Sequence, residues 1–357
     1  MKTIKKLIVL ICGIPLLFTS CSSDDNNSTG NVSGDYSNGI FILNEGKFMT
    51  DNTADVSFLS TDGTLENDIF YGVNNSHLGD TAQSMGFEGD RAYIIVNNSN
   101  VIKVVNRHNF ELITTITTGI QSPRYIVFES GKGYVSNLGN PAETSDDFIA
   151  VIDLNSNQVT TTIPVTEGPE KMIKKDGKLY VAHKGGWGIG KTISVIDLST
   201  HSVITTITVT DFPDGIQEKN GYLYVLCQGL TSWTETPSSQ GTLYKIDLNN
   251  NQIVSALSFP EGVHPSHLEI EDNKLYYTIN NGVYAMDLSA STLPTDAIIT
   301  LNGVFSIYGF EVKDGKIYMS DPKDYNSNGE IFIYSTNGTL INSYEVGIVP
   351  NGFYFTN

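Results

Sequence analysis

The chain has 357 residues and a formal net charge of −18, from 39 acidic and 21 basic side chains. A surface this acidic does not bind nucleic acid through the phosphates, so we expect no nucleic-acid partner. The longest apolar run, residues 7–18, is too short to span a bilayer, and the sequence therefore predicts no transmembrane helix.

The first residues have the layout of a secretory signal peptide. Three lysines precede the apolar run, and the small residues Thr19 and Ser20 follow it, directly before Cys21. This layout resembles the bacterial lipobox, although Phe18 stands where that motif usually has leucine. The resemblance implies that residues 1–20 are a signal peptide and that Cys21 is acylated, which anchors the chain in membrane lipid. The alternative is an ordinary signal peptide followed by a chance cysteine.

Residues 21–36 are predicted to form a lipidated flexible tether, because they are polar and contain almost no apolar side chains. The Ser-Ser-Asp-Asp stretch at 22–25 resembles the acidic tag that sends lipoproteins of Bacteroidota to the outer face of the outer membrane. This implies a lipid-anchored protein at the cell surface. If Cys21 is acylated, Cys227 has no partner for an intramolecular disulfide, so stability must come from core burial.

Residues 37–357 contain a repeat with the spacing of propeller blades, about 40–50 residues. Each unit has two phrases, such as GKLYVAH followed by ISVIDLSTHSV, and both phrases occur seven times. Apolar and polar residues alternate in runs rich in Val, Ile, Thr and Tyr, which predicts strands and no helices. The aspartates that end the second phrases are expected to bond turn N–H groups: Asp153, Asp197, Asp247 and Asp287. We therefore predict an all-β, seven-bladed β-propeller of four-stranded antiparallel blades.

The two ends of this domain complement each other. The final stretch, EVGIVPNGFYF, resembles TTGIQSPRYIVF, which opens an interior unit, whereas the first unit begins at GIFILN without such a strand. We expect the C-terminal strand to complete the N-terminal blade and close the ring. The alternative, a β-solenoid, predicts capping units without this complementarity.

The connections between second and third strands are long and irregular in five units, whereas the turns between first and second strands are tight. Long loops on one rim of a rigid scaffold usually carry function. Both tryptophans of the chain, Trp187 and Trp233, lie in these loops, as do Phe48 and Tyr325. We expect these rings to contact a ligand; the alternative is that they cover neighbouring loops.

Polar residues at the strand ends are expected to face the axial mouth on the same rim. The candidate ligand contacts among them are Asn97, Asn137, His183, Gln228, Asn280 and Asp321 from second strands, and Arg124 from a first strand. Amides and a guanidinium near aromatic rings favour a large polar ligand with apolar faces. The alternative is that these residues only hydrate the axial channel.

No catalytic motif is present, since the sequence lacks both GxSxG and HExxH. His264 and His267 would point to opposite faces of a strand, which disfavours a shared metal ion. The stretch DYNSNGE, from Asp324, resembles the start of a calcium loop, but Ser335 stands where that loop needs glutamate. We predict no enzyme activity, no cofactor and no metal site, and leave a calcium ion near Asp324 as an open alternative.

The phrases IAVIDLNSNQV and ISVIDLSTHSV resemble YncE-type propeller repeats. The phrases GIFILNEG, LGDTAQSM, SPRYI and VGIVPNGFY more closely resemble Bacteroidota surface lipoproteins, whose best-known member is a cobalamin-binding propeller. The resemblance implies a lipoprotein that captures a small-molecule nutrient, such as a corrinoid, for a TonB-dependent transporter. The alternative is a structural or adhesive surface protein that binds a protein or glycan; a lactonase-like or quinoprotein-like enzyme is a third reading.

Overall fold

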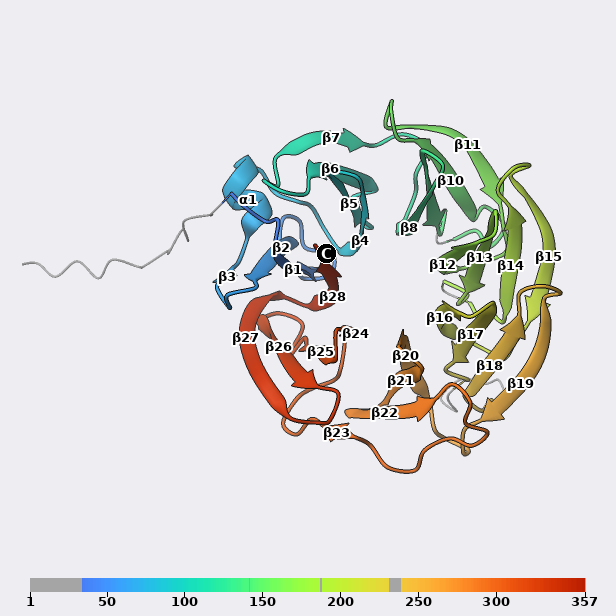
Figure 1. The fold of residues 1–357 in the computed structure, drawn as a ribbon. Coiled ribbons are helices and arrows are strands. Elements are labelled where there is room, and N and C mark those ends of the chain that lie inside the picture. The colour runs from blue at the N-terminus through green and yellow to red at the C-terminus, as the bar shows by residue number, and fades with distance from the viewer. Residues whose placement is uncertain (1–33, 141, 187, 231–238, 357) are drawn as a thin grey trace, which may run out of the picture.

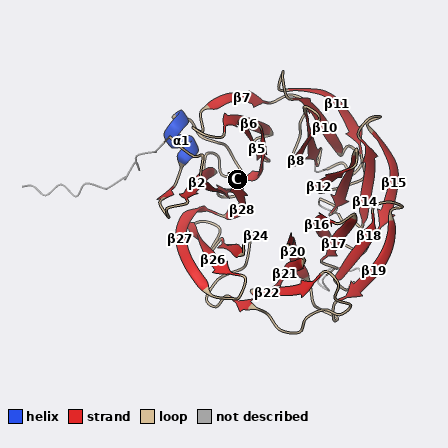
Figure 2. Cartoon of the chain, viewed as in Figure 1, coloured by secondary structure: helices blue, strands red, loops and turns tan. Residues whose placement is uncertain are grey.

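The computed structural model describes residues 34–140, 142–186, 188–230 and 239–356. Their strands form seven four-stranded antiparallel sheets arranged in a ring (Figure 1), which confirms the predicted seven-bladed propeller. Nearly all of the regular structure is strand (Figure 2). In the part of the chain described, no helix has the length and apolar content needed to cross a membrane.

We number the blades by the chain order of their second strands, and each blade runs from its innermost to its outermost strand. Blade 1 contains β28 (Pro350–Phe355), β1 (Gly39–Asn44), β2 (Asp55–Ser60) and β3 (Leu65–Glu66). Blade 2 contains β4 (Ala82–Glu88), β5 (Arg91–Val96), β6 (Val101–Asn106) and β7 (Leu112–Ile116). Blade 3 contains β8 (Pro123–Glu129), β9 (Lys132–Asn137), β10 (Phe148–Asp153) and β11 (Gln158–Pro164). Blade 4 contains β12 (Pro169–Lys175), β13 (Lys178–His183), β14 (Thr192–Asp197) and β15 (Ser202–Thr208).

The remaining three blades follow the same plan. Blade 5 contains β16 (Pro213–Lys219), β17 (Tyr222–Cys227), β18 (Thr242–Asp247) and β19 (Gln252–Ser258). Blade 6 contains β20 (Pro265–Glu271), β21 (Lys274–Ile279), β22 (Gly282–Asp287) and β23 (Ile299–Thr300). Blade 7 contains β24 (Phe310–Lys313), β25 (Lys316–Asp321), β26 (Asn328–Ser335) and β27 (Leu340–Ile348).

The ring closes as the sequence predicts. The C-terminal strand β28 pairs antiparallel with β1, with Ile42 opposite Phe353 and Ile40 opposite Phe355. In Figure 1 the last strand lies on the inner side of the first blade, beside β1 and facing the centre of the ring. One sheet is therefore built from the two ends of the domain, so no first or last blade is left with an unpaired inner edge.

The apolar core is divided among the blade interfaces. Among the described residues, seven buried clusters are found, and each joins two neighbouring blades. In one of them, Tyr93 and Ile95 of β5 pack with Ile126 of β8 and Ile152 of β10. Each large side chain buried in this way stabilises the fold by roughly 1.5–3 kcal/mol. The repeats therefore bury both faces of the second strands, while outermost strands such as β15 and β19 stay mostly exposed.

Three of the four predicted aspartate turns form as expected. The Asp153 carboxylate accepts N–H bonds from Asn155 and Ser156, at 3.1 and 2.8 Å. The carboxylates of Asp197 and Asp247 likewise accept bonds from the N–H groups two residues ahead. At Asp287 the turn bond instead runs from the Ala290 N–H to the aspartate's backbone carbonyl.

A short helix, α1 (Ile69–Asn74), corrects the prediction that the domain has no helices. It lies between β3 and β4, and its Ile69 and Phe70 side chains are fully buried. The Asp55 carboxylate, at the start of β2, accepts the N–H groups of Phe70 and Tyr71 at 2.9 and 3.2 Å. A helix of six residues gives no repeating period in the sequence, and a contact distant in sequence stabilises it.

Candidate functional site

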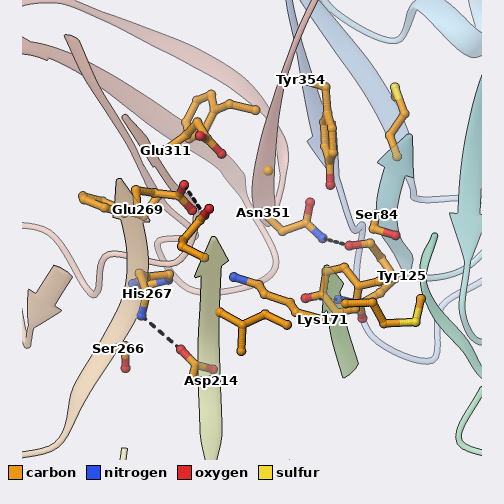
Figure 3. A pocket seen from close by; sticks show the side chains of 18 of the residues that line it. Ser84, Tyr125, Lys171, Asp214, Ser266, His267, Glu269, Glu311, Asn351 and Tyr354 are labelled. Atoms are coloured by element: carbon orange, nitrogen blue, oxygen red, sulfur yellow. Dashed lines mark hydrogen bonds between the residues drawn. The ribbon is translucent and has the colours of Figure 1, made fainter. Parts of the chain in front are cut away.

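A cavity of about 610 Å³ lies at the centre of the ring. Residues of the innermost strand of every blade line it, and several of these residues are ionisable (Figure 3). Pockets of roughly 300–1,000 Å³ are the usual size for small-molecule ligands. The cavity is therefore the candidate site.

One level of its wall can be traced around the ring, because at this level each inner-strand residue pairs with an aromatic residue of the second strand. From blade 1 to blade 7 the inner-strand residues are Tyr354, Gly86, Val127, Ile173, Gln217, Glu269 and Glu311. The level is polar on blades 5, 6, 7 and 1, and it lacks polar side chains on blades 2, 3 and 4. The same position in the repeat therefore gives the cavity a polar wall on one side of the ring and a wall without polar side chains on the other.

Two carboxyl groups from neighbouring blades meet on the polar side. Glu269 and Glu311 are hydrogen-bonded to each other, and Gln217 Nε2 donates to Glu269 Oε2 at 2.7 Å. Burial raises the pKa of Glu311 to about 7, although Lys171 partly opposes the shift. Burial and the charge of Glu311 together raise the pKa of Glu269 well above its usual value. Since two like charges cannot easily coexist here, the pair retains a proton near neutral pH.

Lys171, on β12, is the cation that faces this pair. In Figure 3 its ammonium extends into the cavity between Asp214 and the wall that carries Glu269. Burial alone would lower the pKa of Lys171, but the nearby Tyr125, Asp214 and glutamate groups raise it overall. The side chain therefore stays charged. Its ammonium makes no hydrogen bond or ion pair with any residue that the structure describes.

The other cations near the cavity are already paired. Lys184 Nζ lies 2.5 Å from Asp214 Oδ1. Although burial would raise the pKa of Asp214, the ammonium groups of Lys184 and Lys171 hold it below its usual range. Arg124 Nε donates to both carboxylate oxygens of Glu170 at 3.0 Å. These two pairs neutralise themselves within the protein.

Neutral and acidic groups complete the polar wall. Glu45 accepts bonds from Asn351 Nδ2 and the Tyr308 hydroxyl, both at 2.9 Å, and burial raises its pKa. Asn351 Oδ1 is buried and has no partner among the described residues. His267 lies between the Thr278 hydroxyl and the Tyr308 carbonyl, at 2.8 and 3.1 Å. Burial lowers the pKa of His267 to about 4, so its ring is neutral at physiological pH.

The residues predicted from the sequence fall into several environments. Gln228 lines the cavity and donates to Ser266 Oγ at 2.9 Å. Arg124 borders it, since its guanidinium also donates to the lining residue Gln83. Tyr325 is 38% exposed, and its ring packs edge-to-face on the cavity residue Tyr308.

Four of the predicted polar residues bond to their own surroundings. Asn97 Nδ2 donates to the Pro123 carbonyl, and Asn137 Nδ2 donates to the Val135 carbonyl. His183 is buried against Ser194 Oγ at 2.9 Å, and burial lowers its pKa to about 4. Asp321 accepts the N–H groups of Phe305 and Lys323, both at 3.1 Å. These residues shape the loops around the cavity, and ligand contact at them stays a prediction.

The remaining predicted residues lie away from the cavity wall or outside the description. Asn280 is exposed in the tight turn between β21 and β22, and Phe48 is 62% exposed in the loop after β1. Cys21, Trp187 and Trp233 lie outside the described residues. At Asp324, the carboxylate accepts the N–H groups of Asn326 and Ser327, as in an ordinary turn. No group of three or more potential metal ligands is found among the residues described.

The ionisable wall of the cavity was not predicted from the sequence. Lys171, Glu269 and Glu311 lie in the interior of inner strands, whereas the prediction concentrated on strand ends and loops. A usable signal was present in PEKMIKK and PSHLEIE, where charged residues stand next to apolar ones inside an inner strand. Such residues need a polar cavity or a partner.

Known proteins share the family and the fold of this chain. The family described as "Domain of unknown function (DUF5074)" matches residues 38–356. No curated protein matches the chain. A quinonprotein alcohol dehydrogenase-like protein from Bacteroides thetaiotaomicron superposes with a TM-score of 0.66 at 15% identity, over 90% of this chain and 79% of the other.

Two further solved structures share the architecture. BamB from Moraxella catarrhalis has a TM-score of 0.54 and 14% identity, over 88% of this chain and 85% of its own. Apo AztD from Citrobacter koseri has a TM-score of 0.52 and 14% identity, over 88% and 96%. At these identities the likeness concerns the propeller fold, and the differing names show that this fold serves different roles.

Proposed function

This chain belongs to the DUF5074 family, and we propose that it is a surface lipoprotein whose axial cavity captures a small polar nutrient for a TonB-dependent transporter. The observation that carries the proposal is the cavity of about 610 Å³, walled by inner strands and containing the Lys171 ammonium, which has no acceptor among the described residues. Burying such charges is costly unless a ligand or water satisfies them. A binding role needs this arrangement, whereas a stable propeller does not.

The cavity also bears on the size of the ligand. A corrinoid is too large to enter about 610 Å³ whole, so it would rest over the mouth. There, Phe305 is 66% exposed and contacts the Tyr325 ring edge-to-face at 5.6 Å. A smaller nutrient would enter the cavity itself. A titration with cobalamin separates these two cases, since only a rim-bound corrinoid depends on Phe305.

A second candidate function is glycan or protein adhesion by this rim. The observation that favours it is the exposure of Phe305, Phe48 and Met49, at 66, 62 and 76%. Exposed aromatic rings stack on the apolar faces of sugars. A glycan array on wild type and Phe305→Ala tests this role, which predicts binding that the variant loses.

Native mass spectrometry tests the capture of a small ligand. The mature chain with Cys21→Ala, which cannot be acylated, is incubated with an extract of small metabolites and desalted. We expect a retained mass in this protein, and no retained mass when Gln217→Trp fills the cavity. The control is Lys316→Trp, on the exposed start of β25. Equal retention by both tryptophan variants would place the binding elsewhere and contradict the proposal.

The anchoring half of the proposal has its own test. Cys21→Ala in the full chain should abolish incorporation of labelled fatty acid and release the protein from the membrane fraction. Replacing Asp24 and Asp25 by Ala should leave acylation intact but protect the protein from protease added to whole cells. Labelled fatty acid on the Cys21→Ala protein would show that the lipobox reading is wrong.

A further inference from the structure

The charges that remain unpaired in the cavity have opposite signs and come from different walls. Lys184 is paired with Asp214, and Arg124 is paired with Glu170. The Glu45 carboxyl is held by the neutral groups of Asn351 and Tyr308. Among the described residues, the charged groups that remain are the Lys171 ammonium on blade 4 and the Glu269–Glu311 pair on blades 6 and 7. Figure 3 shows Lys171 reaching toward the centre from one side, with both glutamates across from it. A ligand at the centre therefore meets a cation and an acidic pair together.

This arrangement disfavours ligands with one kind of charge. A simple anion would gain Lys171 but would face Glu269, Glu311 and the nearby acidic groups. A simple cation would gain the glutamate pair but would be repelled by Lys171. A ligand that carries both charges meets an opposite charge at each end, and each charged hydrogen bond is stronger than a neutral one.

The acidic pair offers carboxylate oxygens to a ligand ammonium. Its two carboxyl groups now share a hydrogen bond, and Gln217 Nε2 already holds one oxygen of Glu269. An entering ammonium would donate to both carboxylates and replace the shared proton, which leaves to solvent. The charges then balance, because one positive charge replaces another.

The rest of the wall provides space for an apolar portion of the ligand. Val127 and Ile173 face the cavity on the level of the glutamates, and Met172 and Phe353 also line it. These side chains cannot bond a polar group, so they accommodate hydrocarbon. A small molecule with one ammonium, one carboxylate and an apolar substituent matches all three surfaces.

We infer that the cavity binds a small zwitterion of the amino-acid type, with its carboxylate on Lys171 and its ammonium on Glu269 and Glu311. The inference rests on the proposed function and specifies its ligand class. Free amino acids and short peptides belong to this class.

Calorimetric titration of the mature Cys21→Ala protein with each standard amino acid and with glycyl dipeptides tests the inference. The tightest binder is then compared with its N-acetyl form, which lacks the ammonium, and its amide, which lacks the carboxylate. We expect each derivative to bind about tenfold or more weakly than the parent, since each loses one charged contact. The inference is overturned if no member of the panel binds, or if either derivative binds as tightly as the parent.

Variants assign the two contacts. Lys171→Met should weaken binding of the parent ligand, so that the parent no longer binds more tightly than its amide. The parent should still bind this variant more tightly than the N-acetyl form does. Glu269→Gln combined with Glu311→Gln should do the reverse. The exposed controls Lys316→Met and Glu88→Gln should leave all three affinities unchanged. Melting curves establish that each variant is folded, and a preserved advantage in a folded contact variant would overturn the assignment.

The outcome separates the two levels of the proposal. If amino acids and dipeptides fail but the metabolite extract still loads wild type and not Gln217→Trp, the inference on ligand class falls and cavity capture stands. If neither the amino acids and dipeptides nor any metabolite of the extract binds wild type, the inference on ligand class and the proposal of cavity capture are both wrong.

Discussion

At the scale of single residues, the cavity holds charges that the fold does not use. Lys171 makes no bond to a described residue, and the Glu269–Glu311 pair keeps a proton that bulk water would remove. Such groups reduce stability unless a ligand satisfies them. Perturbed ionisable groups gathered in one cleft are a recognised indication of a functional site. The charged groups of the cavity thus destabilise the empty protein and are available to bind a ligand.

The raised pKa of Glu311 predicts how stability depends on pH. Its folded pKa of about 7 exceeds the ordinary glutamate pKa of 4.5, so the folded state binds the proton more tightly than the unfolded state. The resulting stabilisation is fully present below about pH 4.5 and is lost as the pH rises through 7. Glu311→Gln mimics the protonated form and should therefore stabilise the protein at pH 8 by about 1–2 kcal/mol, because cavity water screens part of the charge. Urea unfolding at pH 4 and pH 8 measures this, and an equal effect at both values would contradict it.

At the scale of elements, the repeat pattern predicts the blades because alternation and turn residues are local properties. The second strands, such as β13 with its sequence KLYVAH, are buried after their first residue and were identified from their phrases. The inner strands are less predictable. Their register shifts between Pro169 and Met172, and similarly in other blades, so period-two reasoning misplaces the residues beyond the shift. Lys171 lies within this shift, so the alternation of the strand does not predict that it faces the cavity.

The helix α1 depends on one carboxylate from a distant element. Asp55 accepts backbone N–H groups from Val56, Phe70 and Tyr71. Asp55→Ala leaves these buried donors without an acceptor and should cost about 1–3 kcal/mol of unfolding free energy. Asp68 is the control, since it stands at the helix N-cap with φ 55° and makes no side-chain cap bond. Asp68→Gly should change the free energy by less than Asp55→Ala, and the reverse order in denaturant unfolding would contradict the account of this helix.

At the scale of the whole molecule, the closed ring is what creates the cavity. Every blade contributes its innermost strand to the wall, and β28 supplies Asn351 and Tyr354 from the C-terminal end. The sequence allowed ring closure to be predicted, because the complementary ends are visible in the repeats. It did not allow the cavity's chemistry to be predicted, because that depends on which of seven equivalent positions face one another.

Deletion of residues 347–357 tests closure. The deletion removes β28, exposes the hydrogen-bonding edge of β1 and opens the cluster that contains Ile42 and Phe353. We expect a lower melting temperature and aggregation in size-exclusion chromatography. Deletion of 22–33, within the predicted tether, is the control and should leave both properties unchanged. A monomeric 347–357 deletion with an unchanged melting temperature would mean that the ends do not share a blade.

The most direct test of the central claim is a crystal structure of the mature Cys21→Ala protein, grown with the metabolite or amino acid that binds it most tightly. The account predicts ligand density in the axial cavity, with an anionic group on Lys171 and an ammonium against Glu269 and Glu311. Density for the ligand only outside the ring, with water alone in the cavity, would contradict it.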